Sequence, residues 1–517
     1  MSDPGTLQAP WLARPGVLRT RTAWAVAAIA VAGWFLRALP LMRSGAFGYP
    51  VDYDEGVYFA TSALLVKGVL PYRDFVFVHP PGLLYFFAPV ASLGVLRDPS
   101  FGFAAARWLA TLVGCANIVL VGRLAMRWAG PVAAILAAAF YATHPVAVPI
   151  ERGPFLEPVL NLCGLWLASV WLAAEEAHPI RWRSVACGAL CGLTASIKIL
   201  GALWLLPCLL SPPRAMSRGG AVALAASAAL VWTAVTAPLF LAAPASFIAQ
   251  LVSFHAHRPP DGTFGGVNRL AEMFWMQGLS LDSSLIFCGL LFAAVRARGA
   301  SRRAERFFAS GFVLIVAAFL ASSTYWSQYN AHLALPESML AGYGAASLWQ
   351  WASQGRARFF RRALVSALLA AVPAWGVRRA LLTGRQRSPE LPALGHFVQA
   401  QIPVDACLLS FEPAWSAAGG RLPDNGPQLP RVVDSYATIL LDALRASRGF
   451  ADTGQAFRDP SSQGTIRRAL EQCRFAIVGG RGYSEMSPET QQWFRSRFVQ
   501  RFPPAGVEGI DVWERAH

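Results

Sequence analysis

The chain has 517 residues, of which 55% are hydrophobic and only 14% are charged, and its mean hydropathy is +0.41. A water-soluble protein of this length needs more polar surface, so the composition excludes an ordinary soluble protein and predicts a polytopic membrane protein. No segment has the alternating pattern of a barrel strand, so we expect the spans to be helices.

Basic residues outnumber acidic ones by 45 to 29, which gives a net charge of +16, and almost all of them are Arg. Such a charge is also found in nucleic-acid-binding proteins. Here, however, the Arg residues gather in short stretches between apolar segments, as the positive-inside rule expects for cytoplasmic loops. We therefore expect membrane lipid, and no nucleic acid, among the partners.

The apolar segments predict about eleven membrane-spanning helices with the N-terminus in the cytoplasm. The first segment follows Arg14, Arg19 and Arg21 without a clear cleavage signal, so we interpret it as an uncleaved span. The expected spans lie near 23–41, 103–124, 130–147, 156–173, 184–197, 199–211, 220–243, 281–297, 307–322, 332–351 and 362–381.

The segment 184–211 is flanked by basic loops on both sides, so both of its ends should face the cytoplasm. Its 28 residues are too few for two full crossings, because a helix rises about 1.5 Å per residue. We expect two short helices that meet partway through the membrane, with Lys198 near the bend.

From about residue 388 the composition becomes more polar, and strand-like runs alternate with helix-like segments. This pattern predicts a small C-terminal α/β domain, with the chain divided into residues 1–385 and 386–517. The expected strands are 406–411, 431–435, 474–480 and 510–515, and the expected helices lie around 392–402, 435–447, 464–472 and 487–498.

The last span should carry this domain out of the cytoplasm, although four Arg residues follow that span and leave a cytoplasmic location open. Outside the cytoplasm, Cys407 and Cys473 could form a disulfide, since both lie near the starts of expected strands. Two buried free thiols are the alternative.

Acidic residues gather in the expected outer loops, above all in the first one, about 42–102. Asp52, Asp54 and Glu55 stand together there, just before residues 56–67, which predict a weakly amphipathic helix at the membrane surface. Helix capping accounts for one such acid, but not for three acids within four residues. We therefore consider a reaction site at the start of this helix.

Other chemically useful residues also fall on the outer side. Glu157 would enter the outer end of a span, where Arg152 could be its salt-bridge partner. Lys198 lies at membrane depth and needs an anion, such as a bound phosphate. His255, Arg258, Tyr329 and His332 complete the set. Together these residues suit a substrate with an apolar tail, an anionic phosphate and a hydroxyl-bearing partner.

The order of these motifs resembles the membrane glycosyltransferases of the GT-C fold over most of residues 20–380. The nearest type is that of family 39, with lipid A aminoarabinose transferases and protein O-mannosyltransferases. The motifs that carry the resemblance are Asp54-Glu55, His79-Pro80-Pro81-Gly82, Arg152 to Glu157-Pro158, Lys198 in a broken span, and HLALPESMLAGYG at 332–344.

The resemblance implies a multi-pass inner-membrane enzyme of the cell envelope. It would transfer a sugar from a polyprenyl phosphate to a hydroxyl of a glycan, lipid or protein outside the cytoplasm, with inversion. Asp54 would be the general base, and Glu55 would support it or contact the acceptor.

Asp54 and Glu157 could hold a divalent cation, Mg or Mn, although many such enzymes need none. The donor phosphate would meet His79, Arg152, Lys198, His255, Arg258, Tyr329 and His332. Because His79 stands where Lys is frequent and a neutral imidazole binds phosphate less well, Arg258 and Lys198 are the stronger candidates.

Two other functions remain open. A transporter or flippase of a lipid-linked sugar would also explain broken helices and a buried Lys. A structural subunit of an envelope-assembly complex would use the C-terminal part for docking, and Asp54→Asn would then affect only stability.

Overall fold

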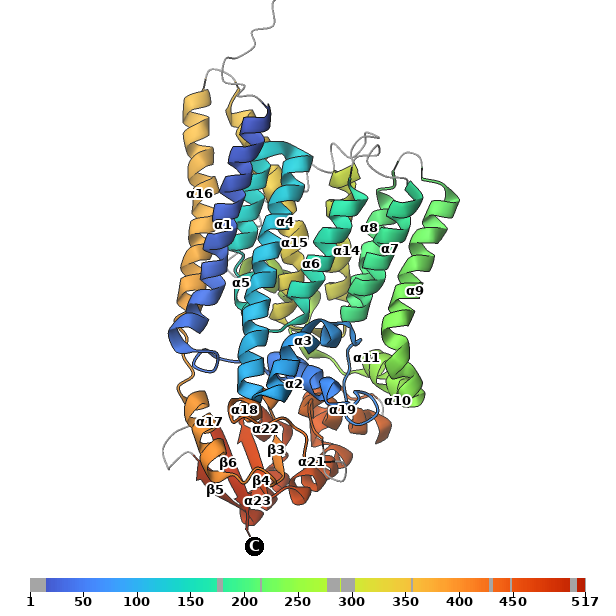
Figure 1. Ribbon diagram of the computed structural model, residues 1–517, viewed down its shortest axis with the longest axis vertical. Helices are drawn as coiled ribbons and strands as arrows, with labels where there is room; N and C mark the ends of the chain where they lie inside the picture. The colour runs from blue at the N-terminus through green and yellow to red at the C-terminus, as the bar shows by residue number, and fades with distance from the viewer. Residues whose placement is uncertain are drawn as a thin grey trace, which may run out of the picture.

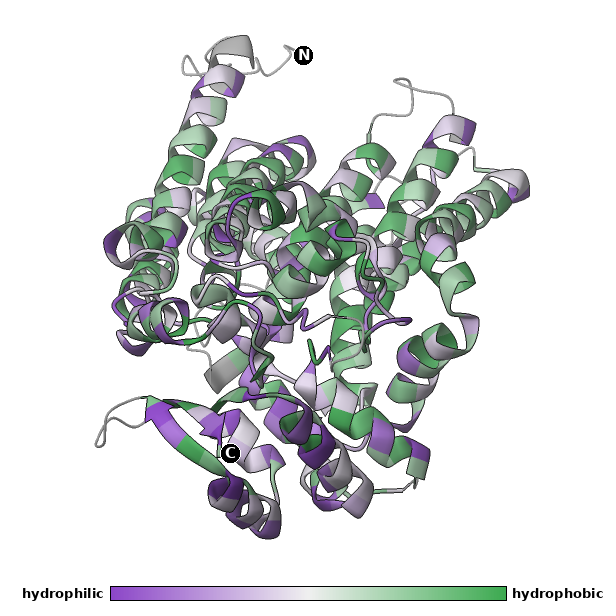
Figure 2. Cartoon of the chain, turned by 60° about the horizontal axis from the view of Figure 1, so that its bottom comes forward, coloured by the Kyte–Doolittle hydropathy of each residue, from purple (hydrophilic) through white to green (hydrophobic). Residues whose placement is uncertain are grey.

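The computed structural model describes residues 15–173, 180–213, 216–276, 289, 303–354, 357–426, 431–446, 449–502 and 509–516. Long helices stand side by side in a bundle, and the C-terminal part, residues 390–515, packs against one end of it (Figure 1). Hydrophobic residues dominate the bundle helices, whereas hydrophilic residues are frequent in the C-terminal part (Figure 2).

Five described helices are long and apolar enough to cross a membrane: Arg19–Ser44 of α1 (Pro15–Ser44), α4 (Pro99–Ala142), α9 (Arg218–Ala242), α14 (Arg303–Ala321) and α16 (Arg358–Thr383). The bundle also contains α5 (Ala147–Ile150), α6 (Leu156–Trp171), α7 (Ile180–Ile197), α8 (Leu205–Leu210) and α15 (Asn330–Ala352). The expected span at 281–297 lies outside the described residues, apart from Gly289. The total of eleven spans stays a prediction.

The element α4 consists of two helices joined at a sharp reversal. Gly130 has φ 85° and ψ −169°, which is not helical, and Pro131 follows it. Ile118 and Ala142 both lie against Gly33 of α1, although a straight helix would hold them about 36 Å apart. The two spans expected near 103–124 and 130–147 therefore correspond to the two arms of α4.

The segment around Lys198 has the broken form that its length predicted. Helix α7 ends at Ile197, Lys198 is extended with φ −144° and ψ 133°, and a 3-10 helix (Ile199–Trp204) leads into α8. The chain turns back here, since the Thr194 hydroxyl donates a hydrogen bond to the carbonyl of Gly201 (3.1 Å). The end of α8 lies beside the end of α6, because the indole of Trp171, the last residue of α6, donates to the carbonyl of Ser211 after α8 (3.1 Å).

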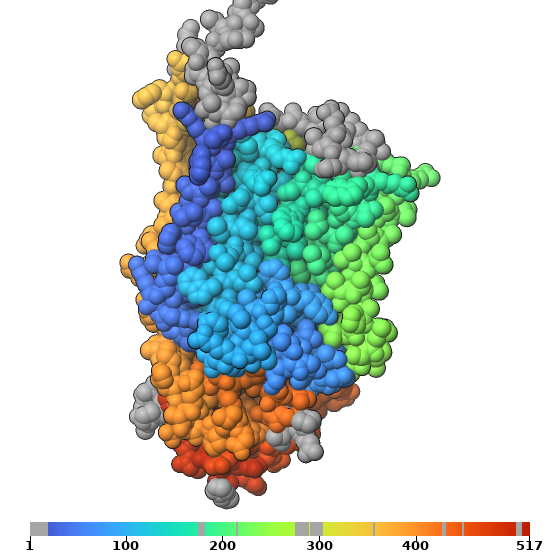
Figure 3. Space-filling view, viewed as in Figure 1, coloured from blue at the N-terminus to red at the C-terminus, as the bar shows by residue number. Residues whose placement is uncertain are grey.

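The loop between α1 and α4 contains α2 (Tyr53–Val66) and α3 (Gly82–Leu96), which lie directly against the C-terminal part (Figure 3). The expectation of a surface-lying amphipathic helix at 56–67 is wrong in one respect. Eleven of the fourteen residues of α2 are buried, because α2 lies between α3 and the C-terminal part. Gly56 allows this packing, since a Cβ there would collide with the backbone of Ala414.

The second half of the bundle has short elements at the same end. They are α10 (Pro244–Ile248), α11 (Phe254–His257), α12 (Gly266–Ala271), β1 (Asp261–Gly262) and β2 (Thr324–Tyr325), with β1 and β2 paired in parallel. Two π-helical turns, Ala249–Ser253 and Glu272–Met276, and a 3-10 turn, Ser327–Tyr329, join them.

The C-terminal part contains a four-stranded sheet in the order β3-β4-β6-β5, in which β3 and β4 are parallel and the other pairs antiparallel. The strands are β3 (Leu408–Ser410), β4 (Phe475–Gly479), β5 (Phe498–Phe502) and β6 (Ile510–Arg515). The helices are α17 (Glu390–Gln401), α18 (Pro413–Ala418), α19 (Ser435–Ala446), α20 (Thr453–Arg458), α21 (Pro460–Gln472), α22 (Gly480–Glu485) and α23 (Pro488–Arg497). The domain boundary at 385/386 stays a prediction.

One expected strand is wrong and one strand was missed. Residues 431–435 do not join the sheet, because Asp434 instead caps α19 by accepting a hydrogen bond from the Ala437 amide (2.8 Å). β5 follows directly on α23, where the sequence predicted that the helix would continue to residue 498.

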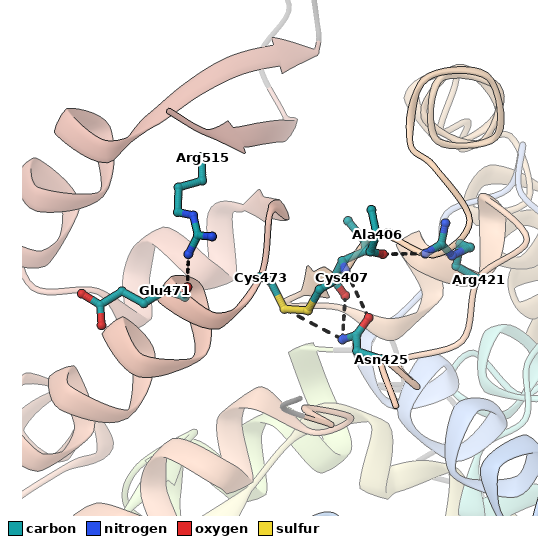
Figure 4. The surroundings of a disulfide bond; sticks show 8 residues. Ala406, Cys407, Arg421, Asn425, Glu471, Cys473 and Arg515 are labelled. Carbon is teal, nitrogen blue, oxygen red and sulfur yellow. Dashed lines mark hydrogen bonds between the residues drawn. A yellow bond between two sulfur atoms is a disulfide. The ribbon is translucent and has the colours of Figure 1, made fainter. Parts of the chain in front are cut away.

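The cysteine alternatives are resolved in favour of a disulfide between Cys407 and Cys473 (Figure 4). The two residues precede the neighbouring parallel strands β3 and β4, and the Phe475 amide donates to the Cys407 carbonyl (3.1 Å). The side chain of Asn425 bonds both the amide and the carbonyl of Leu408 beside this link. The disulfide thus fixes the edge of the sheet.

Candidate active site

The three acids at the start of α2 have different environments. Asp52 is the N-cap: its carboxylate accepts from the Asp54 amide (3.0 Å), while its own amide donates to Glu55 (2.8 Å). This reciprocal arrangement is a capping box. Capping therefore accounts for Asp52 and Glu55, and it leaves the side chain of Asp54 available.

Glu55 is also held by Arg107 of α4. The Arg107 Nε and Nη2 donate to the two carboxylate oxygens of Glu55 at 2.8 and 2.6 Å, and both side chains are buried. Glu55 therefore ties α2 to α4. The side chain of Glu55 does not line the cavity that Asp54 faces, so the two neighbouring acids do not meet in one site.

A cavity of about 160 Å³ lies between one end of the bundle and the C-terminal part. Its wall is polar and combines side chains from both. The bundle side supplies Asp52, Tyr53, Asp54, Tyr58, Val78, His79, Glu157, Lys198, Phe254, Arg258, Trp326, Gln328 and Tyr329, and the C-terminal part supplies Asp434, Tyr436 and Arg481. We call it the acidic cavity, since Asp52, Asp54, Glu157 and Asp434 all line it.

The pKa of Asp54 is raised from 3.8 to about 6, mainly by burial. The nearby carboxylate of Asp434 also raises this pKa, and its effect is larger than the opposite effect of Arg481. The Gln328 amide donates to the Asp54 carboxylate at 3.2 Å and so holds its direction. A carboxylate with a pKa near neutral is well placed to accept a proton from a substrate.

Lys198 and Glu157 form a buried ion pair in the wall of the same cavity, with 2.9 Å between Nζ and Oε1. The break after α7 directs the ammonium to this place, and it also lies 3.8 Å from the centre of the Tyr329 ring. The predicted pairing of Arg152 with Glu157 is wrong. Arg152 belongs to the turn before α6 and donates instead to the Tyr49 hydroxyl (2.7 Å) and the Ala380 carbonyl (3.0 Å), outside the cavity.

A second cavity, of about 220 Å³, adjoins the first. We call it the cationic cavity, because it contains Lys198 and Arg258 and no carboxylate. Its lining consists of His79, Pro80, Lys198, Ile199, Leu200, Leu251, His255, Arg258, Ala318, Phe319, Ser322, Ser323, Thr324 and Tyr329. Four residues, His79, Lys198, Arg258 and Tyr329, line both cavities. The aliphatic side chains form an apolar wall, and Ile199 is 55% exposed on the outside of the bundle.

Arg258 stands at the junction of the two cavities. Its Nη2 donates to the Tyr436 hydroxyl (3.0 Å) and to Asp261 (3.2 Å), so a residue of the C-terminal part helps to position it. Its Nε is buried without a hydrogen-bond partner in the described part of the chain, as is the Thr324 hydroxyl. Buried polar groups of this kind normally have a partner, which indicates a polar ligand here.

Of the three predicted histidines, His79 and His255 are close together, with ring centroids 6.0 Å apart. The Nε2 of His255 donates to the Val78 carbonyl (2.7 Å). Burial and neighbouring cations lower the pKa of both imidazoles, so both are neutral near pH 7. His332 lies deeper, bonded to Asn161 (3.0 Å), and it lines neither cavity.

Sequence reasoning missed the contribution of the C-terminal part. Asp434 accepts a hydrogen bond from the Tyr53 hydroxyl (2.8 Å), and the Arg481 guanidinium lies 4.1 Å from the Tyr53 ring centre. Asp434 precedes Ser435 and could have been recognised as a helix N-cap. Nothing in the neighbouring sequence, however, indicates that Asp434 lies beside Tyr53 and Asp54, more than 370 residues earlier in the chain.

The predicted metal ligands offer a poor cation site. No group of three or more His, Cys, Asp or Glu side chains suited to a metal ion occurs among the described residues. Glu157 already has an ammonium partner in Lys198, so a divalent cation shared with Asp54 would meet a positive charge at close range. The possible Mg or Mn site at Asp54 and Glu157 stays untested.

The helical bundle has the GT-C fold, as the sequence motifs predicted. Residues 77–323 match the family model described as glycosyltransferase family 87. No curated protein matches the chain.

Two groups of solved structures have the same fold. ArnT from Cupriavidus metallidurans superimposes with a TM-score of 0.61 in its apo state and 0.58 when bound to undecaprenyl phosphate, at 17% identity, covering 96% and 97% of this chain and 98% of ArnT. The Archaeoglobus fulgidus oligosaccharyltransferase AglB, in complex with an inhibitory peptide and a dolichol-phosphate, gives 0.60 at 11% identity over 96% of this chain and 74% of its own.

Proposed function

We propose that this protein is an inverting membrane glycosyltransferase that moves a sugar from a polyprenyl phosphate to an acceptor hydroxyl outside the cytoplasm, with Asp54 as general base. The observation that carries the proposal is the position of Asp54. Among the three acids at the start of α2, Asp54 alone neither caps the helix nor forms an ion pair. It lines the acidic cavity, which adjoins the cationic cavity.

The cationic cavity suits the lipid phosphate of the donor. Lys198 and Arg258 would contact the phosphate, and the free Arg258 Nε and Thr324 hydroxyl would complete its hydrogen bonds. The apolar wall around Ile199 and Leu251 would guide the polyprenyl chain into lipid. The solved ArnT and AglB structures with undecaprenyl phosphate and dolichol-phosphate support this assignment by their common fold.

The acidic cavity suits the acceptor. In the transfer, the acceptor oxygen forms a bond to the anomeric carbon, and the bond from that carbon to the phosphate oxygen breaks with its electron pair staying on the phosphate. Asp54 takes the hydroxyl proton, and the cations of Lys198 and Arg258 stabilise the charge that develops on the leaving phosphate. Attack on the face opposite the phosphate inverts the anomeric centre.

Glu157 has a positioning role in this mechanism. It holds the Lys198 ammonium between the two cavities at 2.9 Å and compensates its charge when no donor is bound. The C-terminal part contributes Asp434, Tyr436 and Arg481 to the wall, so we propose that it lies on the outer side and shapes the acceptor site. An oxidising outer compartment also agrees with the Cys407–Cys473 disulfide.

The test is mass spectrometry of polyprenyl-phosphate sugars and envelope glycans in cells that lack the protein. We expect one carrier-linked sugar to accumulate and one glycan residue to disappear. The wild-type gene and the variant Asp405→Asn should restore the profile, because Asp405 is exposed and lines neither cavity, whereas Asp54→Asn should not. An unchanged profile, or full restoration by Asp54→Asn, would contradict the proposal and favour a structural subunit or a flippase.

A further inference from the structure

The largest of the described cavities lies at the opposite end of the bundle from the active site. It has a volume of about 790 Å³, within the usual range of ligand pockets, and its lining residues belong to α1 and the first arm of α4. These two helices lie side by side in the bundle (Figure 1). Its lining consists of Arg19, Thr22, Ala23, Val26, Ala27, Val119, Gly122, Arg123, Met126, Arg127 and Gly130.

The cavity combines an apolar inner wall with a basic mouth. Val26 of α1 lies against Gly122 of α4, so the two helices touch at the deeper end. Arg19, Arg123 and Arg127 are near the end of the bundle, and the two on α4 are one helical turn apart and so share a face.

Among the described residues, no acid pairs with the three guanidinium groups, which are exposed at the mouth of the cavity. No Asp or Glu lines the cavity, and none of the three Arg side chains makes a hydrogen bond or ion pair within the described residues. Exposed like charges at one mouth repel one another only weakly through solvent, and a bound anion would offset this repulsion. The positive-inside rule accounts for Arg residues at this end, but not for an apolar chamber between them.

We propose that this cavity binds the phosphate headgroup of an anionic phospholipid, with the acyl chains against the apolar wall. Guanidinium groups bind phosphate oxygens in pairs, and basic pockets between membrane helices suit acidic lipid headgroups. A free phosphate ion would leave the wall of Val26, Val119 and Met126 without a partner, which is why a lipid fits better. The proposal does not depend on the glycosyltransferase function.

Bound lipid would join the first helix of the bundle to α4. Arg107 and Asn117, which contact Glu55 and Glu151, are on the same arm of α4 as Arg123 and Arg127. The lipid would therefore stabilise the arm whose other end supports the start of α2.

The test is native mass spectrometry of the purified full-length protein with phosphatidylglycerol or phosphatidylcholine of identical acyl chains. We expect phosphatidylglycerol to bind at least about tenfold more tightly, because its headgroup has a net negative charge, whereas the phosphate of phosphatidylcholine is balanced by its own quaternary ammonium. The triple variant R19Q/R123Q/R127Q should lose this preference. The matched variant R181Q/R218Q/R358Q, which removes three exposed Arg residues from the same end outside the cavity, should keep it.

Three results would overturn the proposal. Equal binding of the two lipids would exclude headgroup recognition, and equal losses in the two triple variants would indicate a general effect of charge. Displacement of the lipid by excess inorganic phosphate would assign the cavity to a free ion. Thermal unfolding of both variants checks that each retains the wild-type fold.

Discussion

The acidic and cationic cavities share four residues but differ in charge. Four carboxylates line the first, and none lines the second. A transfer reaction makes opposite demands at its two ends, since the nucleophile must lose a proton while the leaving group gains negative charge. Lys198 stands at the boundary, paired with a carboxylate on one side and open to the cationic cavity on the other.

The largest effect on this difference between the two cavities is expected from removing Lys198. Lys198→Met should lower kcat/KM at least about 100-fold, because the charge that stabilises the leaving phosphate is lost. It should also destabilise the fold by about 3–5 kcal/mol, because Glu157 is left buried and unpaired. Transfer assays and thermal unfolding measure the two effects.

The double variant Lys198→Met/Glu157→Gln separates the two roles. We expect it to recover most of the stability, since no unpaired charge remains, but none of the transfer. If transfer returned with stability, Lys198 would be only a structural partner of Glu157.

The position of Lys198 also shows what the sequence can predict. Basic loops on both sides and a length of 28 residues require a broken, re-entrant segment, and the Lys at its bend must then find an anion. The GT-C motifs likewise predicted Asp54 and Glu157 in one site. The first prediction depends on the membrane, which constrains each segment separately, whereas the second depends on the resemblance to GT-C enzymes.

The errors concern side-chain direction and distant contacts. Arg152 and Glu157 are close in sequence, but one belongs to a turn and the other to the first turn of α6, so they point to different neighbours. Asp434 and Arg481 come from a polar part of the chain where charged residues are common. Only the packing of that part onto α2 brings them to Asp54.

The pH dependence tests the acidic side of the comparison. Asp54 must be charged to act as a base, and its pKa is raised from 3.8 to about 6. We expect kcat/KM to be constant above this pH and to fall about tenfold per unit below it. Because burial favours the protonated form, Asp54 should lower stability as the pH rises from about 4 to 6.

Asp434→Asn provides the matched variant for this profile. Asn can still cap α19, but the negative charge that raises the pKa of Asp54 is gone. The acid limb should move to lower pH. An unmoved limb would show that the C-terminal part does not act on the base.

The disulfide tests how firmly the C-terminal wall must be held. The variant C407S/C473S should lose up to about 4 kcal/mol of stability in the C-terminal part, from the closed loop of 66 residues. At room temperature transfer should fall only slightly, and on heating it should be lost earlier than in the wild type. Cys115→Ala, at a free cysteine, is the control. If C407S/C473S and the wild type lost activity at the same temperature, the disulfide would have no supporting role.

The smallest expected effect is that of Tyr436→Phe. This change removes the hydroxyl that accepts from Arg258 and donates to Asp261. The KM for the donor should rise about three- to sixfold, the value of one hydrogen bond, with kcat unchanged. A fall in kcat with constant KM would place Tyr436 in the chemical step instead.

The central claim is that Asp54 is the general base, and single-turnover transfer by purified full-length protein tests it most directly. Asp54→Asn should bind the polyprenyl-phosphate donor within about twofold of wild type and transfer its sugar about 100- to 10,000-fold more slowly. Transfer by Asp54→Asn at the wild-type rate would contradict the account.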